Sequence, residues 1–376
     1  MIKTEYYKDL TKMNTFGMKV KARCFIEYDS VADLVDIEFE ELARPVLHIG
    51  GGSNLLFTDD FKGTVLHSKI DFIEILNGSP EPHCDDRDSL CHCEERSDVA
   101  ISSPVLVSVG AGVVFDDFCA WAAKEGLWGV ENLSYIPGEV GASAVQNIGA
   151  YGVEVKDVIH KVYCYDTVEE EFVSFSVEEC GYGYRDSFFK RPEIKGRYVV
   201  THVVFALSRE PRPVLEYGHL KEAVADCHFE RSGSGDEKSL TPALIRKVII
   251  RIRKEKLPEP SVKGSAGSFF KNPVIPMEHY LRIEATAKAE FGPDYKVPHY
   301  DLPDGMVKIP AAWMIEQCGW KGKRSGGAAV WDKQPLVIVN HTGEAYPEEI
   351  VGLEKRIIAS VKARFGVELH PEVEHI

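Results

Sequence analysis

Two short segments carry residue types that could bind an anion or move a proton. The run Gly50-Gly51-Gly52-Ser53-Asn54 brings several backbone N–H groups together beside two polar side chains, which suits a buried diphosphate. An ordinary tight connection would use the same residues. The segment from Gly264 to Pro273 places Ser268 in a glycine-containing turn beside two phenylalanines. That hydroxyl could protonate a substrate carbanion, or it could simply bond to the backbone.

Cationic side chains occur at two further places. Arg246, Arg253 and Lys256 lie close to one face of an expected helix. There they could grip a diphosphate or a carboxylate, or they could form a solvated face. Arg185 follows a Gly-Tyr-Gly-Tyr turn and could bind an anion or pair with Asp186.

A long segment from Glu131 to Glu154 is rich in glycine and other small residues and shows neither helical nor strand periodicity. Such a composition predicts an ordered functional loop with short elements. Small residues let the backbone approach a flat ring system closely. A crowded packing corner would explain the glycines but explains Gln146 and Asn147 less readily, so contact with a cofactor is favoured.

Three better-known site types are disfavoured. The Gly110-Ala111-Gly112 turn imitates a dinucleotide fingerprint, but Phe115 occupies the position of the third glycine, so we interpret it as a structural turn. The Ser268 segment is not a Gly-x-Ser-x-Gly nucleophile elbow. A group of histidines and cysteines lacks the paired spacing of a zinc site. Its members are His83, Cys84, Cys91, His92 and Cys93.

The elements expected to position these segments alternate between strands and helices. Two polar stretches, 77–104 and 226–241, are interpreted as surface insertions. Strands are expected at 45–49, 105–109 and 367–369, with antiparallel strands within 158–207. Helices are expected at 115–124, 242–256 and 347–365.

The composition indicates a globular, enzyme-sized protein. The chain has 376 residues, 44% of them hydrophobic, which is enough for two or three domains. A net charge of −15 argues against nonspecific binding to nucleic acid or to anionic membranes. Without a signal-peptide pattern or a long apolar run, we expect a cytoplasmic protein that is not inserted in a membrane. The nine cysteines are odd in number and are expected to be reduced thiols.

Ten motifs occur in order along the chain and cover nearly all of it outside the two polar stretches. They are NTFG (14–17), GGGSNLLF (50–57), IPGEVGASAVQNIGAYGVE (136–154), GYRDSFF (183–189), PVLEYGHL (213–220), KLPEP (256–260), GSAGSFFKNP (264–273), AAWMIEQCGWKG (311–322), GGAAV (326–330) and HPEVE (370–374). Taken together, they resemble the family of UDP-N-acetylenolpyruvoylglucosamine reductases.

This resemblance implies an α+β fold with three domains. A p-cresol methylhydroxylase-type FAD-binding domain would consist of two α/β subdomains, at 1–67 and 68–209, followed by a C-terminal α/β substrate-binding domain at 210–376. The tyrosine-bearing loop around Tyr217 makes the chain similar to the longer of the family's two types.

Site residues follow from the resemblance position by position. Ser268 matches the general acid, and Arg185 and Glu372 match the other catalytic positions. The positions that match substrate contacts are Tyr217, Arg253, Lys256, Asn272 and Gln317. The positions that match FAD contacts are Gly50, Gly51, Gly52, Ser53, Asn54, Gly138, Gly141, Ala142, Gln146, Asn147 and Gly149.

The resemblance also implies a reaction. NADPH and FAD would reduce UDP-N-acetylglucosamine enolpyruvate to UDP-N-acetylmuramate in peptidoglycan precursor synthesis, with Ser268 protonating the carbon next to the one that receives hydride. We expect a monomer. The alternatives are another flavin oxidoreductase on the same scaffold and a noncatalytic protein that binds nucleotide sugars.

Overall fold

The computed structural model describes residues 1–76, 103–229 and 240–376. These residues divide into two compact units. The first unit comprises 1–2, 27–40 and 67–250, and the second comprises 3–26, 41–66 and 251–376. The expected three-domain boundaries stay a prediction. Most of the two expected insertions falls outside the described residues, as does the whole His83 to Cys93 group.

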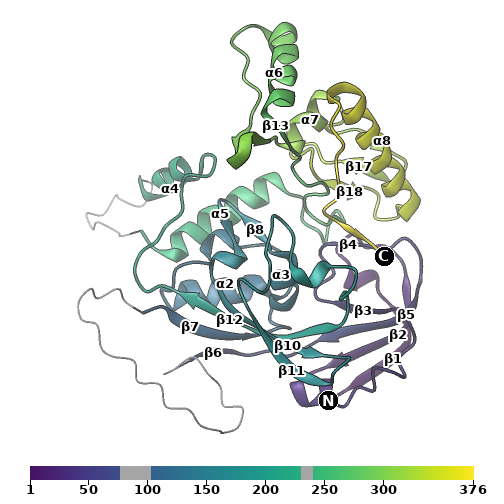
Figure 1. Ribbon diagram of the computed structural model, residues 1–376. Coiled ribbons are helices and arrows are strands. Elements are labelled where there is room, and N and C mark those ends of the chain that lie inside the picture. The colour runs from purple at the N-terminus through teal and green to yellow at the C-terminus, as the bar shows by residue number, and fades with distance from the viewer. Residues whose placement is uncertain (77–102, 230–239) are drawn as a thin grey trace. The chain divides into compact units, whose positions relative to one another are not determined.

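The first unit is built on a five-stranded sheet with the order β11-β10-β12-β7-β6 (Figure 1). Every neighbouring pair in it is antiparallel. The expected strand at 105–109 and the antiparallel strands within 158–207 are therefore confirmed. The strands are β6 (Ile73–Ile75), β7 (Val105–Gly110), β10 (Ile159–Asp166), β11 (Glu171–Ser176) and β12 (Tyr198–Leu207).

Helices α2 (Phe115–Lys124) and α3 (Val140–Gln146) pack against this sheet (Figure 1). The ring of Phe118, on α2, lies 4.6 Å from the ring of Phe205, on β12. The expected helix at 115–124 is confirmed as α2. The helices that begin in this unit are α1 (Val31–Val35), α2 (Phe115–Lys124), α3 (Val140–Gln146), α4 (Leu220–Phe229) and α5 (Pro242–Lys256).

The second unit contains several small sheets in place of one large one. Their strand orders are β1-β2-β5-β3, β13-β15-β14, β16-β17-β18 and β19-β4. The strands are β1 (Lys3–Asp9), β2 (Lys21–Tyr28), β3 (Val46–Ile49), β4 (Leu55–Leu56), β5 (Phe61–Ser68), β13 (Val274–Pro276), β14 (Tyr300–Asp301), β15 (Met306–Lys308), β16 (Arg324–Ser325), β17 (Ala328–Val330), β18 (Ile338–Asn340) and β19 (Glu374–His375).

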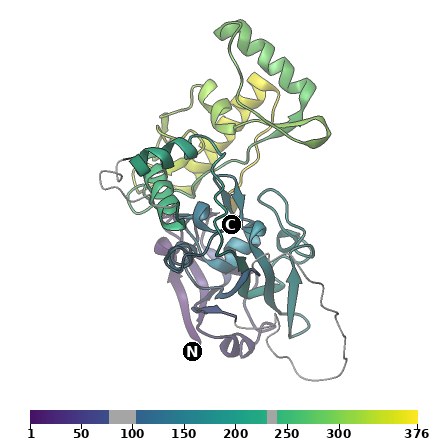
Figure 2. The same ribbon diagram turned by 90° about the vertical axis from the view of Figure 1, so that its left-hand side faces the viewer.

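Three helices pack on these sheets: α6 (Met277–Phe291), α7 (Ala311–Gln317) and α8 (Pro347–Phe365). Figure 2 shows α6 as the green helix at the upper edge, and it contacts β13, which precedes it, and β15, which follows it. The Glu349 carboxylate accepts the Tyr346 N–H at 2.9 Å at the start of α8, and Gly366 ends the helix in a left-handed conformation. These caps explain why the expected helix at 347–365 is confirmed.

The expected terminal strand at Val367–Leu369 is wrong. Residues 367–370 belong to no strand, and the terminal strand is β19, which pairs in parallel with β4. The buried side chains of Val367 and Leu369 pack into the core of the second unit, which explains why they are apolar. Their apolar alternation therefore reflects packing and not a ladder of backbone hydrogen bonds.

Candidate active site

The Gly50 to Asn54 loop presents backbone donors that the protein does not use. In the part of the chain that the structure describes, the N–H groups of Gly50, Gly51 and Gly52 donate to no acceptor. The turn at 110–112 differs, because its three N–H groups all donate to protein carbonyls at 2.9 or 3.0 Å. The first loop therefore fits a diphosphate, whereas the second is a structural turn, as the sequence indicated.

The conformation of this loop requires glycine at position 52. Gly52 has φ +59°, and a Cβ atom there would lie 1.9 Å from the carbonyl oxygen of Met13. The Thr15 N–H donates to the Gly52 carbonyl at 3.1 Å. The loop is thus packed directly on the turn that precedes β2.

Asn14 organises that turn with its buried side-chain amide. Its Nδ2 group donates to the carbonyls of Leu10 and Met18 at 2.8 and 3.0 Å, and its Oδ1 atom accepts the Met18 N–H at 2.8 Å. The same turn supports the segment that carries Ser268, because the Ser265 N–H donates to the Thr15 carbonyl at 2.9 Å. The motif at 14–17 therefore connects the glycine loop to the segment that carries Ser268, the predicted general acid.

Ser268 and Glu372 lie on adjoining extended segments. Phe270 pairs with Pro371 in an antiparallel bridge, and the Glu372 N–H donates to the Phe269 carbonyl at 2.8 Å. Phe269 and Phe270 are fully buried, whereas Ser268 is exposed. The structure therefore places two of the three predicted catalytic residues on paired segments and leaves Ser268 exposed.

Asn54 connects the glycine loop to the same place. Its Nδ2 group donates to the Glu372 carbonyl at 3.0 Å, and its own carbonyl accepts the Glu374 N–H at 3.0 Å. One parallel pairing, β19 with β4, continues this contact. The predicted diphosphate loop and both predicted proton-handling residues of the second unit thus share one hydrogen-bonded framework.

Asn272 and Gln317 occupy opposite ends of α7. The Asn272 Oδ1 atom accepts the Ala311 N–H at 2.9 Å and so caps the start of the helix. Gln317 is the last residue of the helix, and its carbonyl accepts from Arg364 at 2.8 Å. Six helical steps separate the two ends by roughly 9 Å.

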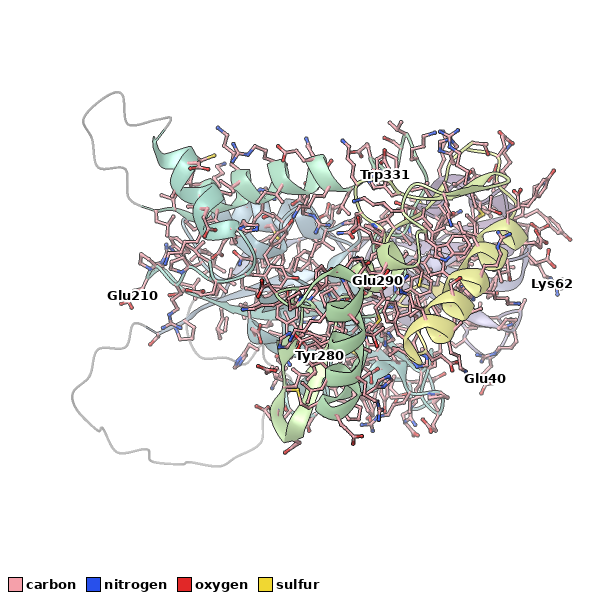
Figure 3. The ribbon with its side chains drawn as sticks, turned by 90° about the horizontal axis from the view of Figure 1, so that it is seen from above. Glu40, Lys62, Glu210, Tyr280, Glu290 and Trp331 are labelled. Atoms are coloured by element: carbon pink, nitrogen blue, oxygen red, sulfur yellow. The ribbon has the colours of Figure 1, made fainter. Side chains whose placement is uncertain are left out.

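The cationic residues near the end of α5 have different surroundings. Arg253 is half-buried and Lys256 is exposed. The indole of Trp331, which is labelled in Figure 3, donates to the Lys256 carbonyl at 3.1 Å. Arg246 instead forms a two-pronged ion pair with Asp116. Arg246 is therefore engaged by a carboxylate of the protein itself.

The small-residue loop of the first unit is ordered and contains the short helix α3, as predicted. A Cβ atom at Gly141 would lie 2.9 Å from the Cβ of Ala111, so close packing explains this glycine. Gly138, with φ +121°, accepts the Phe115 N–H at 3.0 Å. Ala142 follows and is half-buried. The alternative of a crowded corner therefore accounts for Gly141 without any cofactor.

Asn147 is fully buried and its side chain bonds within the protein. Its Nδ2 group donates to the Gly183 carbonyl at 2.7 Å and to Glu154 at 3.2 Å. Its Oδ1 atom accepts the Lys156 N–H at 3.3 Å. The residue is left-handed, with φ +45°. Its amide therefore shapes the loop around the next site residue, Arg185.

Arg185 is held against this loop. Its guanidinium donates to the carbonyls of Asn147 and Gly149 and lies 3.9 Å from a Glu154 carboxylate oxygen. It also stacks over the ring of Tyr184 at 5.2 Å. The side chain is 17% exposed. These contacts therefore fix the orientation of the guanidinium, while part of the side chain remains exposed at the surface of the unit.

Two further contacts of the first unit involve predicted site residues. The Lys190 ammonium donates to the Gln146 side chain and to the Arg185 carbonyl, both at 3.1 Å. Tyr217 is exposed, and its ring meets that of Tyr151 edge to face at 6.0 Å. Sequence reasoning did not identify Lys190 or Glu154, because neither residue type carries a local signal there.

The predicted site residues are thus divided between the units. Arg185, Tyr217 and the FAD positions from Gly138 onward belong to the first unit. Ser268, Glu372, the glycine loop and the other four substrate positions belong to the second.

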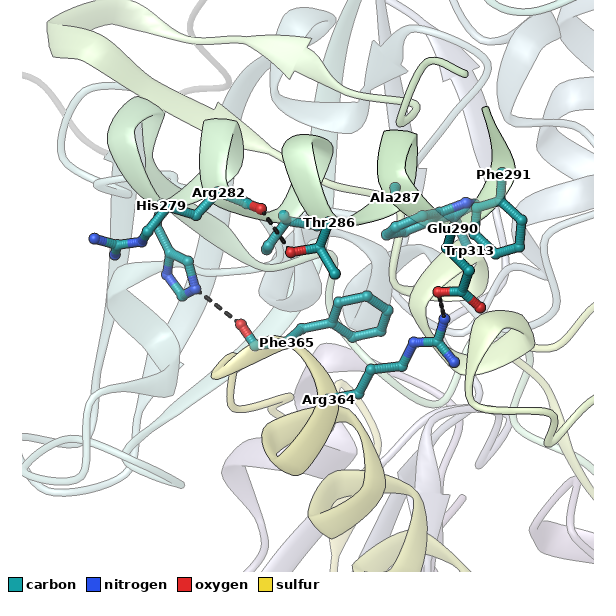
Figure 4. A pocket seen from close by; sticks show the side chains of 10 residues that line it. His279, Arg282, Thr286, Ala287, Glu290, Phe291, Trp313, Arg364 and Phe365 are labelled. Atoms are coloured by element: carbon teal, nitrogen blue, oxygen red, sulfur yellow. Dashed lines mark hydrogen bonds and ion pairs between the residues drawn. The ribbon is translucent and has the colours of Figure 1, made fainter. Parts of the chain in front are cut away.

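The second unit also contains a pocket of about 180 Å³ (Figure 4). It is formed by α6, α7 and the end of α8, and the Glu290–Arg364 ion pair closes one side at 2.6 Å. The lining residues include none of the predicted site positions. They are His279, Arg282, Ile283, Thr286, Ala287, Glu290, Phe291, Trp313, Arg364 and Phe365.

Some site types are not found in the described ranges. Across residues 1–76, 103–229 and 240–376, no cluster of three or more metal-ligating side chains occurs. No helix in those ranges has the length and apolarity needed to cross a bilayer. The six cysteines within the described residues are free thiols, as expected.

Comparison with known proteins identifies the family. A family model described as the C-terminal domain of UDP-N-acetylenolpyruvoylglucosamine reductase matches residues 259–376, and one described as an FAD binding domain matches 99–173. The UDP-N-acetylenolpyruvoylglucosamine reductase of Bacteroides fragilis (strain YCH46) is 46% identical over 368 residues, with 98% of each chain covered. The enzyme of that name from Porphyromonas gingivalis (strain ATCC 33277) is 42% identical over 372 residues, covering 98% of this chain and 97% of its own.

A crystal structure of UDP-N-acetylenolpyruvylglucosamine reductase from Thermus caldophilus supports the fold. It superimposes with a TM-score of 0.60 at 22% identity and covers 100% of this chain and 98% of its own. The expected α+β fold class is confirmed, with an FAD-binding domain and a C-terminal reductase domain. The chain belongs to the family of UDP-N-acetylenolpyruvoylglucosamine reductases, which are FAD-containing oxidoreductases of peptidoglycan synthesis.

Proposed function

We propose that this protein reduces UDP-N-acetylglucosamine enolpyruvate to UDP-N-acetylmuramate with NADPH as the electron donor. Bound FAD supplies the hydride transfer, from NADPH to the methylene carbon of the enolpyruvyl group. The name shared by relatives 42–46% identical over nearly the whole chain supports this substrate. The residues of the chain have the tasks of holding FAD, orienting the substrate and delivering the proton.

The fit of the glycine loop supports its role in holding FAD. The unused N–H groups of Gly50, Gly51 and Gly52 would neutralise the diphosphate, with Ser53 and Asn54 beside them. The positions in the first unit would contact the rest of the cofactor. Because the Asn147 side chain is bonded within the protein, its contact would go through the backbone. The remaining positions are Gly138, Gly141, Ala142, Gln146 and Gly149.

Ser268 would protonate the carbon next to the one that receives hydride. Its hydroxyl is exposed while the following phenylalanines are buried, so the segment is rigid and the donor is accessible. Glu372, held one residue away through Phe269, would orient Ser268 or assist its proton transfer. This pairing is the observation that carries the proposal.

Arg185 would stabilise the negative charge that builds up on the substrate carboxylate. A guanidinium stays charged and can bond a carboxylate with two parallel hydrogen bonds. The carbonyls of Asn147 and Gly149 orient it beforehand, so little reorganisation is needed when charge develops.

The other polar positions would bind the nucleotide part of the substrate. Arg253 and Lys256 would neutralise the pyrophosphate, and Asn272 and Gln317 would donate or accept hydrogen bonds from the two ends of α7. Tyr217 would cover the substrate with its exposed ring. The proposal includes a monomer acting in the cytoplasm, in keeping with the six described cysteines, which are free thiols.

The test follows the two halves of the reaction separately under anaerobic conditions. The purified protein should show a flavin spectrum, bleach when NADPH is added, and recover its colour when the enolpyruvyl nucleotide sugar follows. A colourless protein would contradict the role of FAD. Bleaching without recovery would contradict the substrate, and recovery with unrelated sugars or alcohols would favour another flavin oxidoreductase.

A further inference from the structure

His67 is buried between two carboxylates in the first unit, to which the last two residues of β2 and of β5 belong. Its Nδ1 atom lies 3.0 Å from a Glu27 oxygen, and its Nε2 atom lies 3.0 Å from a Glu139 oxygen. The side chains of His67 and Glu139 are 3% and 9% exposed. None of these residues belongs to the predicted site, and the proposed reaction makes no use of them.

The geometry places a proton on each ring nitrogen. A neutral imidazole has a single N–H, so it can donate to one carboxylate only and would direct a lone pair at the other. An imidazolium donates to both. Two carboxylates this close to each other without a cation between them would also repel strongly in a buried site. His67 is therefore best satisfied in its charged form.

The surroundings of His67 favour the same form. Burial lowers its pKa, but hydrogen bonds and charge from Glu139, together with the bond from Glu27, outweigh burial, so the net pKa is raised. The charge of Lys69, which follows β5, opposes this rise in the His67 pKa. Tyr28, at the end of β2, stays a neutral phenol because burial raises its pKa, and it bonds Ser68.

Glu139 connects this cluster to the loop that carries the predicted FAD contacts. It is the residue that precedes α3, and its carbonyl accepts the Ser143 N–H at 2.9 Å. The next two N–H groups, of Val140 and Gly141, donate to the carbonyls of Val113 and Ala111. The direction in which the chain enters α3 is thus fixed at Glu139, while Gln146 and Asn147 follow at the end of the helix.

We propose that His67 is a positioning residue for FAD: as an imidazolium it holds Glu139, and through Glu139 the start of α3 and the loop beyond it. This inference rests on the proposed FAD contacts of Gln146, Asn147 and Gly149. It does not depend on Ser268, on NADPH or on the identity of the substrate. A His67 that has lost one proton donates to one carboxylate only, so Glu27 and Glu139 no longer share a donor and the start of α3 is held less firmly.

The experiment measures His67 and FAD retention separately. The ring nitrogens of ¹⁵N-histidine-labelled holoprotein are followed by NMR from about pH 5 to pH 9, a range centred on ordinary histidine titration. FAD released at equilibrium is measured by dialysis over the same range for the parent protein and for H67Q and E139Q. The D166N variant is the control, because it breaks the buried Asp166–Arg197 pair of the same unit without touching β2, β5 or α3.

His67 should remain an imidazolium at pH values where ordinary histidines are neutral. FAD affinity of the parent should fall as the pH rises through the His67 titration, since the bound form carries the proton. At acidic pH, H67Q should bind FAD at least about fivefold more weakly than the parent does, which is the smallest effect typical of two linked sites. Its FAD affinity should also no longer depend on pH in this way. In E139Q the His67 midpoint should move to lower pH, and D166N should keep the parent profile.

Three results would overturn the inference. One is a neutral His67 at about pH 6, which would put the proton on a carboxyl group instead. Another is a parent-like FAD affinity and pH profile in H67Q, or in E139Q if H67Q does not fold. The third is the same change in D166N, which would reveal general destabilisation. If the proposed substrate or the role of Ser268 fails, the FAD measurements are unaffected.

Discussion

The backbone N–H of Glu372 donates to the carbonyl oxygen of Phe269 at 2.8 Å, across a sequence separation that no local motif spans. Through this bond the terminal segment is fixed beside the predicted acid, Ser268. The Asn54 side chain holds the Glu372 carbonyl from the glycine loop. Hydrogen bonds thus join three segments to which resemblance gave separate roles. They contain the predicted general acid Ser268, the predicted catalytic residue Glu372 and the glycine loop predicted to bind FAD.

Gly52→Ala should damage that framework. Its Cβ would meet the Met13 carbonyl oxygen at 1.9 Å, so the loop or the turn at 14–17 must move. We expect the free energy of unfolding to fall by at least about 2 kcal/mol more than in Gly305→Ala, and FAD content to drop. Gly305 is the matched control, because it has φ +68° but no atom within 4 Å of an added Cβ.

For the control, left-handed strain alone should cost about 1–2 kcal/mol. Urea unfolding and flavin absorbance measure both variants. Equal losses in the two variants, with FAD retained, would show that the contact with Met13 is not what demands glycine at 52.

Arg185→Lys should slow the second half of the reaction. Lysine keeps the charge but lacks the planar guanidinium of arginine. That group donates to two loop carbonyls and, in the proposed reaction, also bonds the substrate carboxylate. Substrate reduction should slow by about a hundredfold, while flavin content stays near that of the parent. Stopped-flow measurement of the two half-reactions separates these effects.

Arg191→Lys is the matched control. Arg191 also stacks over an aromatic ring, at 5.4 Å from Phe188, but it is exposed and lies outside the predicted site. If both lysine variants lose the same activity, the effect belongs to the local fold and not to a carboxylate contact of Arg185.

The pair of His375 and Glu354 should make stability depend on pH. The contact with the Glu354 carboxylate, at 3.2 Å, raises the His375 pKa, and burial only partly opposes it. A raised pKa in the folded state stabilises the fold fully below the ordinary histidine pKa of about 6.5, and this contribution is lost as the pH rises through the folded value.

Glu354→Gln removes that contribution. The difference in the free energy of unfolding between the parent and this variant should therefore shrink with rising pH, and urea titrations at a series of pH values measure it. A difference that stays constant or grows would mean that His375 is neutral in the folded protein. The contributions of the other histidines to the pH dependence cancel in this difference, because both proteins contain them.

The helices and the core sheet could be predicted because their signals are local. Pro347 and Gly366 delimit α8 through backbone preferences that act within one turn. The terminal strand was misplaced because a strand needs a partner edge, and its partner is β4, over 300 residues earlier in the chain. The apolar residues Val367 and Leu369 have the pattern of a strand but pack as loop side chains.

The candidate site followed from resemblance more than from chemistry. The run of consecutive glycines predicted the N–H groups of the glycine loop as an anion site. The residues around Ser268, by contrast, do not distinguish it from an ordinary serine in a turn. Asn147 shows the limit of residue type: the amide suggested a ligand, but its side chain is bonded within the protein. The partners Glu154 and His67 were missed because their roles depend on neighbours distant in sequence.

The most direct test is Ser268→Ala followed through the two half-reactions, with Ser265→Ala as control in the same segment. Ser268→Ala should keep FAD and its bleaching by NADPH, but recovery of colour with the enolpyruvyl substrate should slow by about 10²–10⁴-fold, because the proton donor is gone. Ser265→Ala should react like the parent, since its backbone bond to Thr15 remains. Recovery at the parent rate in Ser268→Ala would contradict the account.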